Sequence, residues 1–168
     1  MSPEQGKMFL NFFVASIEQE SQTTQKVIAA VPDGEKNYKP AEKSMTAHEL
    51  AWHIPEAEIW ILKSVVDGEF VMPDHTAASQ KPGTIAEILK WYDTNLKEQI
   101  ARLKALPADK VVKVIPFFGM EQPAVMYLSI LTHHSVHHRG QLSTYLRPMG
   151  AKVPSIYGGS ADEPFQAG

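Results

Sequence analysis

Apolar residues recur at three- and four-residue spacing in four stretches of the chain, which is typical of helices that bury one face. The pattern predicts helices over residues 3–31, 46–66, 84–106 and 123–149. A capping residue or a proline precedes each stretch, and proline or glycine follows it. The chain is therefore predicted to be all-α, most simply an antiparallel four-helix bundle that forms one domain over residues 1–168.

A few segments interrupt or join the helical pattern. Pro55 lies inside the second stretch, so the helix either kinks or begins again near that residue. Residues 69–83 form a loop long enough to be functional or mobile. Residues 111–123 fit a short β-ribbon or an extended piece, and the tail 151–168 has no periodicity and is expected to be irregular.

The composition is that of an ordinary globular domain, with 43% hydrophobic and 21% charged residues. A formal net charge of −3 and the lack of a basic run argue against nucleic-acid binding. No stretch reaches the roughly 18 apolar residues of a membrane helix, and the N-terminus does not look like a signal peptide. We expect a soluble cytoplasmic protein. Because the chain has no cysteine, disulfides, cysteinyl zinc sites and a thiol nucleophile of its own are excluded.

Four of the seven histidines lie within LTHHSVHHRG, residues 131–140. At about 100° per residue, His134 and His138 fall on the apolar stripe of the predicted helix, whereas His133 and His137 fall on its flank. Imidazoles one turn apart have Cβ atoms on the order of 6 Å apart and can converge on one ion. Burying two of them beside leucines is unfavourable unless each finds a partner. The inward pair therefore favours a shared metal ion.

A third inward histidine comes from the second predicted helix. His53 lies at the edge of its apolar stripe, whereas His48 points to the opposite side of the helix. His53 is therefore the natural third ligand, although a hydrogen-bonded core histidine is the alternative for a lone inward imidazole. A metal-free network of histidine hydrogen bonds is the corresponding alternative for all three. His75 lies in the loop and has no predicted role.

Three stretches carry a resemblance to a known family. They are LAWHIPEAE at 50–58, HHSVHHRGQLSTYLRPMG at 133–150 and VPSIYGGS at 153–160. Over essentially its full length the chain resembles the DinB/YfiT-like superfamily of metal-binding four-helix bundles, and the most specific motif is H-x-x-x-H-R-G-Q followed by Y-L-R-x-x-G. The resemblance implies a divalent metal held by His53, His134 and His138, the same residues that helical phase selects. It also implies a homodimer and, as in members with known activity, transfer or isomerisation that uses low-molecular-weight thiols.

Three neutral imidazoles leave coordination positions open, as in catalytic rather than structural zinc sites. Zinc or nickel is the expected ion, and Fe²⁺, Co²⁺ and Mn²⁺ also fit the ligand set. Ligating imidazoles usually donate their other N–H group to an acceptor. Gln141 and Tyr145 lie near the same stripe and are candidates for contacting the ligands or a substrate. An ordinary core tyrosine is the alternative for Tyr145.

Other residues near the histidines have weaker predictions. Glu56 and Glu58 fall away from the centre of the stripe, and a solvated helix face is expected for both rather than a role as base or ligand. Gly140, inside a helix, indicates close helix packing. Arg139 contacts either a substrate or the tail. The two flanking histidines are expected on a solvated or dimer-facing surface.

The sequence leaves two classes of function open. The first is a metal-dependent enzyme that activates a low-molecular-weight thiol, or water, for transfer to a small electrophilic substrate. Because the chain has no cysteine, the thiol is a cosubstrate. The alternatives are a metal-dependent hydrolase and a bundle that binds metal without catalysis. The expected partners are small molecules and a second copy of the chain, and neither nucleic acid nor a membrane.

Overall fold

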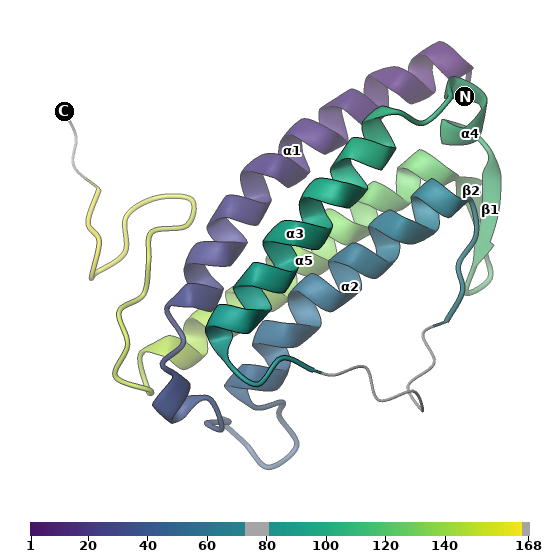
Figure 1. Cartoon of the computed structure of the whole chain (residues 1–168). Coiled ribbons are helices and arrows are strands. Elements are labelled where there is room, and N and C mark those ends of the chain that lie inside the picture. The colour runs from purple at the N-terminus through teal and green to yellow at the C-terminus, as the bar shows by residue number, and fades with distance from the viewer. Residues whose placement is uncertain (73–80, 166–168) are drawn as a thin grey trace.

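Long helices form most of the molecule. The computed structural model describes residues 1–72 and 81–165, and in it the long helices lie side by side as a bundle (Figure 1). These helices are α1 (Pro3–Ala29), α2 (Ala47–Asp67), α3 (Ile85–Lys104) and α5 (Tyr127–Leu146). Both α1 and α2 pack against α3 and α5. The molecule is thus a mostly helical bundle, as expected, with one small sheet.

Local capping signals define where the first three long helices begin. The side chains of Ser2, Thr46 and Thr84 each accept a hydrogen bond from the backbone N–H three residues on. A glutamine or glutamate at that third position reaches back to the cap, which completes a capping box. α1 ends at Ala29, slightly earlier than predicted. α2 continues through Pro55 as one helix, so the alternative that it begins again there is wrong.

Short elements connect the long helices. They are the 3₁₀ turns η1 (Asp33–Glu35) and η2 (Ala124–Met126), the short helix α4 (Ala108–Val111), and the strands β1 (Val114–Phe117) and β2 (Met120–Pro123). The two strands pair antiparallel, which confirms the predicted β-ribbon. The Tyr127 hydroxyl donates to the Ile115 carbonyl at 2.8 Å and ties the ribbon to α5. Because η2 precedes it, α5 is shorter than the predicted helix over 123–149.

Buried apolar side chains fill the bundle as two clusters. The cluster at the ribbon end includes Leu10, Leu62, Tyr92, Ile115 and Leu128. The cluster at the other end includes Ile28, Leu50, Ile88, Leu142 and Met149. Among the described residues, no helix is both long enough and apolar enough to span a bilayer.

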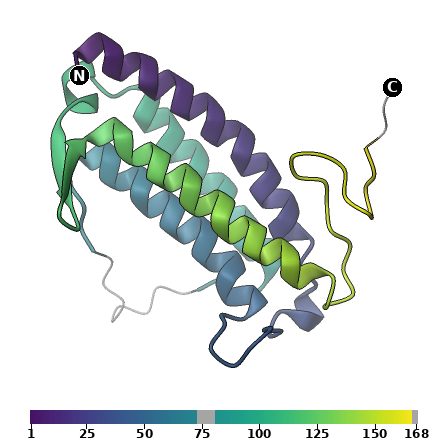
Figure 2. The same cartoon turned by 180° about the vertical axis from the view of Figure 1, so that it is seen from behind.

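The chain beyond α5 returns toward α1 (Figure 2). The Tyr157 hydroxyl donates to the Glu20 carboxylate at 2.7 Å, which links the tail to α1. Residues 151–165 form neither helix nor strand, as expected for the irregular tail. Part of the predicted loop 69–83, including His75, lies outside the described residues.

Candidate metal centre

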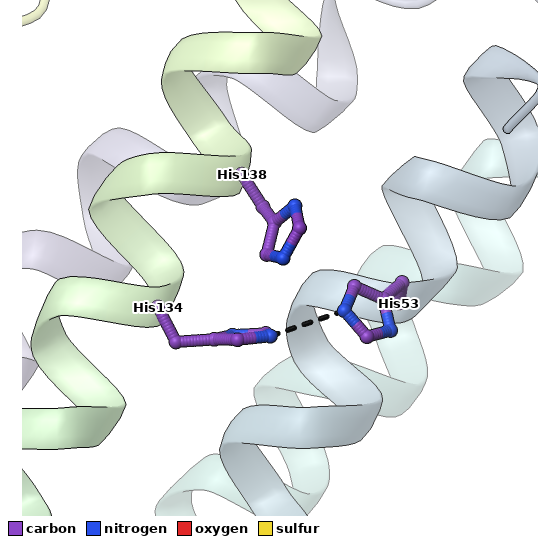
Figure 3. Close-up of side chains that lie close together, drawn as sticks. All are labelled: His53, His134 and His138. Carbon is purple, nitrogen blue, oxygen red and sulfur yellow. Dashed lines mark hydrogen bonds between the residues drawn. The ribbon is translucent and has the colours of Figure 1, made fainter. Parts of the chain in front are cut away.

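His53 of α2 and His134 and His138 of α5 point toward one another across the contact between these helices (Figure 3). One ring nitrogen of each lies within 4.8 Å of the others, and the Nε2 atoms of His53 and His134 are 3.0 Å apart. Two nitrogens bound at about 2.0–2.1 Å to one ion are roughly 3 Å apart when they meet at a right angle. In residues 1–72 and 81–165, this is the only such group of three histidine, cysteine or acidic side chains. The cluster is therefore able to hold a metal ion.

The two histidines of α5 lie at the edge of its buried face. His134 and His138 are half-buried, whereas Leu131, Ser135 and Arg139 are buried. The predicted stripe placed the histidines nearer its centre. The difference arises because α5 packs against both α1 and α2, which widens its buried face and shifts the centre. The edge position leaves the histidines within reach of small molecules.

The remaining histidines of the described chain lie outside the cluster. His133 and His137 are exposed on the outer side of α5, as predicted for the flanking pair. The His137 ring packs edge-on against His138, with 4.8 Å between ring centroids. His48 is half-buried near the start of α2 and contributes no nitrogen to the cluster.

The surroundings of the cluster favour neutral imidazoles. Burial is the larger cause, and the neighbouring histidines the smaller, of a lowered pKa at His134, which together they bring to about 4, because the neighbours disfavour a second positive charge. Burial is also the main reason why the pKa values of His53 and His138 are lowered. A neutral imidazole keeps the lone pair that a metal ion needs. At neutral pH the donor set is therefore ready to bind a cation without first losing protons.

Gln141 contacts the cluster directly. Its Oε1 atom lies 3.1 Å from Nδ1 of His138, so Nδ1–H donates to the amide oxygen and Nε2 keeps its lone pair. The Gln141 amide nitrogen in turn donates to the Tyr145 hydroxyl at 3.4 Å. Tyr145 is buried and packs edge-on against Tyr38, so it is a core tyrosine that reaches the cluster only through Gln141. Gln141 thus orients His138 in the way that partners of metal-binding imidazoles do.

A pocket of ≈ 390 Å³ opens beside His53 and His134. Its other lining residues come from α2, the segment after it, the β-ribbon and α5: Glu56, Ala57, Trp60, Ile61, Met72, Phe117, Phe118 and Ile130. Larger hollows of ≈ 500 and ≈ 620 Å³ lie along α3, are lined mainly by polar and charged residues, and adjoin none of the three histidines. The pocket that contacts the cluster is thus the apolar one.

Glu58 is buried, so the prediction of a solvated helix face is wrong for this residue. It is 2% exposed, and it accepts hydrogen bonds from Tyr92 Oη and Ser135 Oγ, each at 2.8 Å. Burial raises the pKa of the Glu58 carboxyl to about 7, although both hydrogen bonds oppose that change. Its spacing of four residues from Ile54 was the available signal, since that spacing continues the buried face of α2.

Arg139 contacts the tail and α1. Of the two predicted roles, contact with a substrate or with the tail, the structure thus supports the tail. Its guanidinium is 1% exposed and forms an ion pair with Glu20 at 2.7 Å. It also donates to the Tyr157 hydroxyl of the tail and lies 5.0 Å from the centre of that ring. The prediction that Gly140 permits close helix packing is wrong, because no described atom of another helix lies within 4 Å of where its Cβ would be.

The sequence of this helical bundle matches a known family. A family model described as DinB matches residues 5–166. The chain therefore belongs to the DinB family.

Two relatives from Bacillus subtilis (strain 168) are similar in sequence, and both are named as uncharacterized proteins. YrdA is 31% identical over 156 residues, which cover 92% of this chain and 91% of YrdA. YjoA is 26% identical over 114 residues, which cover 68% of this chain and 73% of YjoA.

Two crystal structures share the architecture. One is a DinB-like protein from Bacillus cereus ATCC 10987, with a TM-score of 0.72, 26% identity, and coverage of 86% of this chain and 95% of that protein. The other is the DinB-like YjoA, with a TM-score of 0.68, 22% identity, and coverage of 86% and 96%. The likeness to YjoA at this identity concerns the fold alone.

Proposed function

We propose that the protein is a metal-dependent enzyme that activates a low-molecular-weight thiol for transfer to a small electrophilic substrate. His53, His134 and His138 would hold the ion, with zinc or nickel expected first, in an antiparallel four-helix bundle of the DinB/YfiT type. The observation that carries the proposal is the convergence of three imidazole nitrogens beside a pocket. A ligand set of three leaves a coordination position for a group that comes from solution.

The roles of the chain's own residues follow from their positions. A bound divalent ion would stabilise the thiolate form of a cosubstrate at neutral pH. Gln141 holds His138 in orientation, and Glu56 lines the pocket beside His53, where its carboxylate can accept the proton that the thiol loses. The sulfur then forms a bond to the electrophilic atom of the substrate, and the leaving group departs with the electrons of the broken bond. The absence of cysteine supports an external thiol.

Hydrolysis is the second candidate, and Glu56 is the observation that favours it. A carboxylate in the same pocket as two metal ligands can take a proton from water instead of a thiol. The same ligand set would serve both reactions. A bundle that binds metal without catalysis requires neither Glu56 nor the pocket.

The first experiment measures the metal content of protein purified without nickel resin. We expect inductively coupled plasma mass spectrometry to find about one divalent ion per chain. The same measurement identifies the ion as zinc, nickel, iron, cobalt or manganese. His53→Ala is expected to lose the ion, and His48→Ala, on the same helix but outside the cluster, is expected to keep it. The reverse result would contradict the ligand set.

The second experiment separates the candidate reactions. Metal-loaded protein is assayed with bacillithiol, mycothiol and glutathione against a panel of electrophiles, and with ester and amide substrates in the absence of thiol. Metal-dependent conjugation with one thiol is expected. Turnover that needs no thiol supports the hydrolase, and no turnover in either assay supports a non-catalytic metal-binding bundle. We also propose a cytoplasmic homodimer, which rests on the resemblance and which light scattering and cell fractionation test.

A further inference from the structure

The pocket beside His53 and His134 is lined mostly by carbon. We propose that it binds an aryl group of the substrate and places the polar, reactive end of that molecule at the two histidines. This inference rests on the proposed function for the chemistry at the reactive end. It adds to that function the class of substrate, which is a small, neutral, aryl-bearing electrophile.

Trp60 shows why the walls recognise an apolar group. Its indole N–H already donates to the Val71 carbonyl at 2.8 Å, so the side chain has no free donor and offers only its ring. The Trp60 ring packs edge-on against Phe117, and Phe117 is stacked on Phe70 with 4.1 Å between centroids. Rings held by other rings form a fixed wall, and an aromatic ligand gains contact with such a wall without reordering it.

Phe118 lies at the turn of the β-ribbon and lines the same pocket. Its side chain is 76% exposed, which is unfavourable for a large apolar group. Its backbone has φ of 45°, a left-handed conformation that residues other than glycine rarely adopt. The hairpin accounts for this conformation, because a two-residue turn with positive φ at both Phe118 and Gly119 suits the twist of the strands, and the turn holds the exposed ring at the pocket. An aryl group in the pocket would cover Phe118.

The charge and the volume of the pocket further restrict the class of substrate. Of the lining residues that the structure describes, Glu56 is the only acidic one and none is a lysine or arginine, so this lining disfavours an anionic substrate and tolerates a neutral one. The volume of ≈ 390 Å³ is near the lower end of the roughly 300–1,000 Å³ that ligand pockets occupy. A small ring with a short reactive arm suits these limits better than a long acyl chain.

The experiment compares two hydroxamates on cobalt-loaded protein. Acetohydroxamate and benzohydroxamate share one metal-binding group and differ in a methyl or a phenyl, and their binding is followed by the visible spectrum of the cobalt ion. We expect benzohydroxamate to bind roughly tenfold or more tightly than acetohydroxamate, because the phenyl is buried in the pocket. Equal affinities on protein that has taken up cobalt would overturn the inference while leaving the metal site intact.

A second test fills the pocket with a phenylalanine side chain and compares that variant with one that carries the same substitution elsewhere. Ala57 is half-buried and lines the pocket, so Ala57→Phe is expected to remove the preference for phenyl and to keep cobalt uptake and acetohydroxamate binding. Ala86→Phe introduces the same side chain on the exposed side of α3 and is expected to keep the preference. A preference that survives in Ala57→Phe would contradict the inference.

A measurement without metal keeps the two proposals distinguishable. Toluene has no metal-binding group, and we expect it to shift the NMR methyl signals of Ile61 and Ile130, which line the pocket. Ile28 lies in the other core cluster, and its methyl signals, which are expected not to shift, serve as the internal control. If these signals do not move, the aryl pocket is refuted whether or not the protein binds metal. If they move in protein that takes up no metal, only the proposed function fails.

Discussion

Replacing Glu58 with glutamine tests whether a buried carboxyl makes the stability of the bundle depend on pH. Glu58 accepts hydrogen bonds from Tyr92 and Ser135, and burial raises its pKa from 4.5 to about 7. Glutamine has nearly the same shape and keeps one acceptor oxygen, but it does not ionise. The difference between wild type and Glu58→Gln therefore isolates the titration of this one group.

The sign and size of the effect follow from linkage. A carboxyl whose pKa is higher in the folded than in the unfolded state contributes stability that is fully present below about pH 4.5 and is lost as the pH rises through about 7. With these two pKa values, the wild type loses about 2 kcal/mol of unfolding free energy between about pH 5.5 and about pH 8.5. Relative to wild type, Glu58→Gln is therefore expected to gain about 2 kcal/mol over the same interval.

The assay is urea denaturation of chelator-treated protein at both pH values. The histidines titrate in both proteins, so their contribution cancels in the difference. Ser135→Ala provides the control because Ser135 donates to Glu58. Its destabilisation is expected to grow with pH in the wild-type background and to be independent of pH in the Glu58→Gln background. A gap between wild type and Glu58→Gln that stays constant or shrinks with rising pH would refute the reasoning.

Three further predictions concern the cluster and its surroundings. The double variant His134→Ala/His138→Ala is expected to lose the bound metal, and the exposed His133→Ala to keep it; full metal occupancy in the double variant would exclude these ligands. Gln141→Leu is expected to weaken metal affinity about 10- to 100-fold, measured by chelator competition, and an unchanged affinity would mean that Gln141 does not orient His138. Arg139→Leu is expected to lower the free energy of unfolding by about 3–5 kcal/mol in urea denaturation, because the Glu20 carboxylate loses its buried cationic partner. A loss below about 1 kcal/mol would show that solvent compensates for the lost ion pair.

Helical periodicity was sufficient to predict the cluster because its members belong to two long helices. His134 and His138 are one turn apart, and His53 faces the same helix contact from α2. Spacing within a helix depends on local geometry alone, so it can be read from the sequence. The same spacing separated His133 and His137 from the ligand candidates.

The buried polar groups were harder to predict because their partners lie on other helices. The hydrogen bonds to Glu58 come from Tyr92 of α3 and Ser135 of α5. Arg139 is paired with Glu20 of α1. A charged residue is normally assigned to the surface unless a partner is known, and no local pattern identifies partners that lie 34, 77 and 119 residues away. The same limit applies to the pocket, whose far wall is the β-ribbon.

The distance along the chain between the ligands has a consequence for how the cluster comes into being during synthesis. His53 and His134 are separated by 81 residues, and the ribosome makes α5 after α2 and α3. In a nascent chain His53 leaves the ribosome before α5 is made. The cluster of three imidazole nitrogens therefore exists only after α5 has emerged and packed against α2. A metal ion bound by all three histidines would therefore enter after translation of the bundle. It would cross-link α2 and α5 and so close the long loop of chain between them.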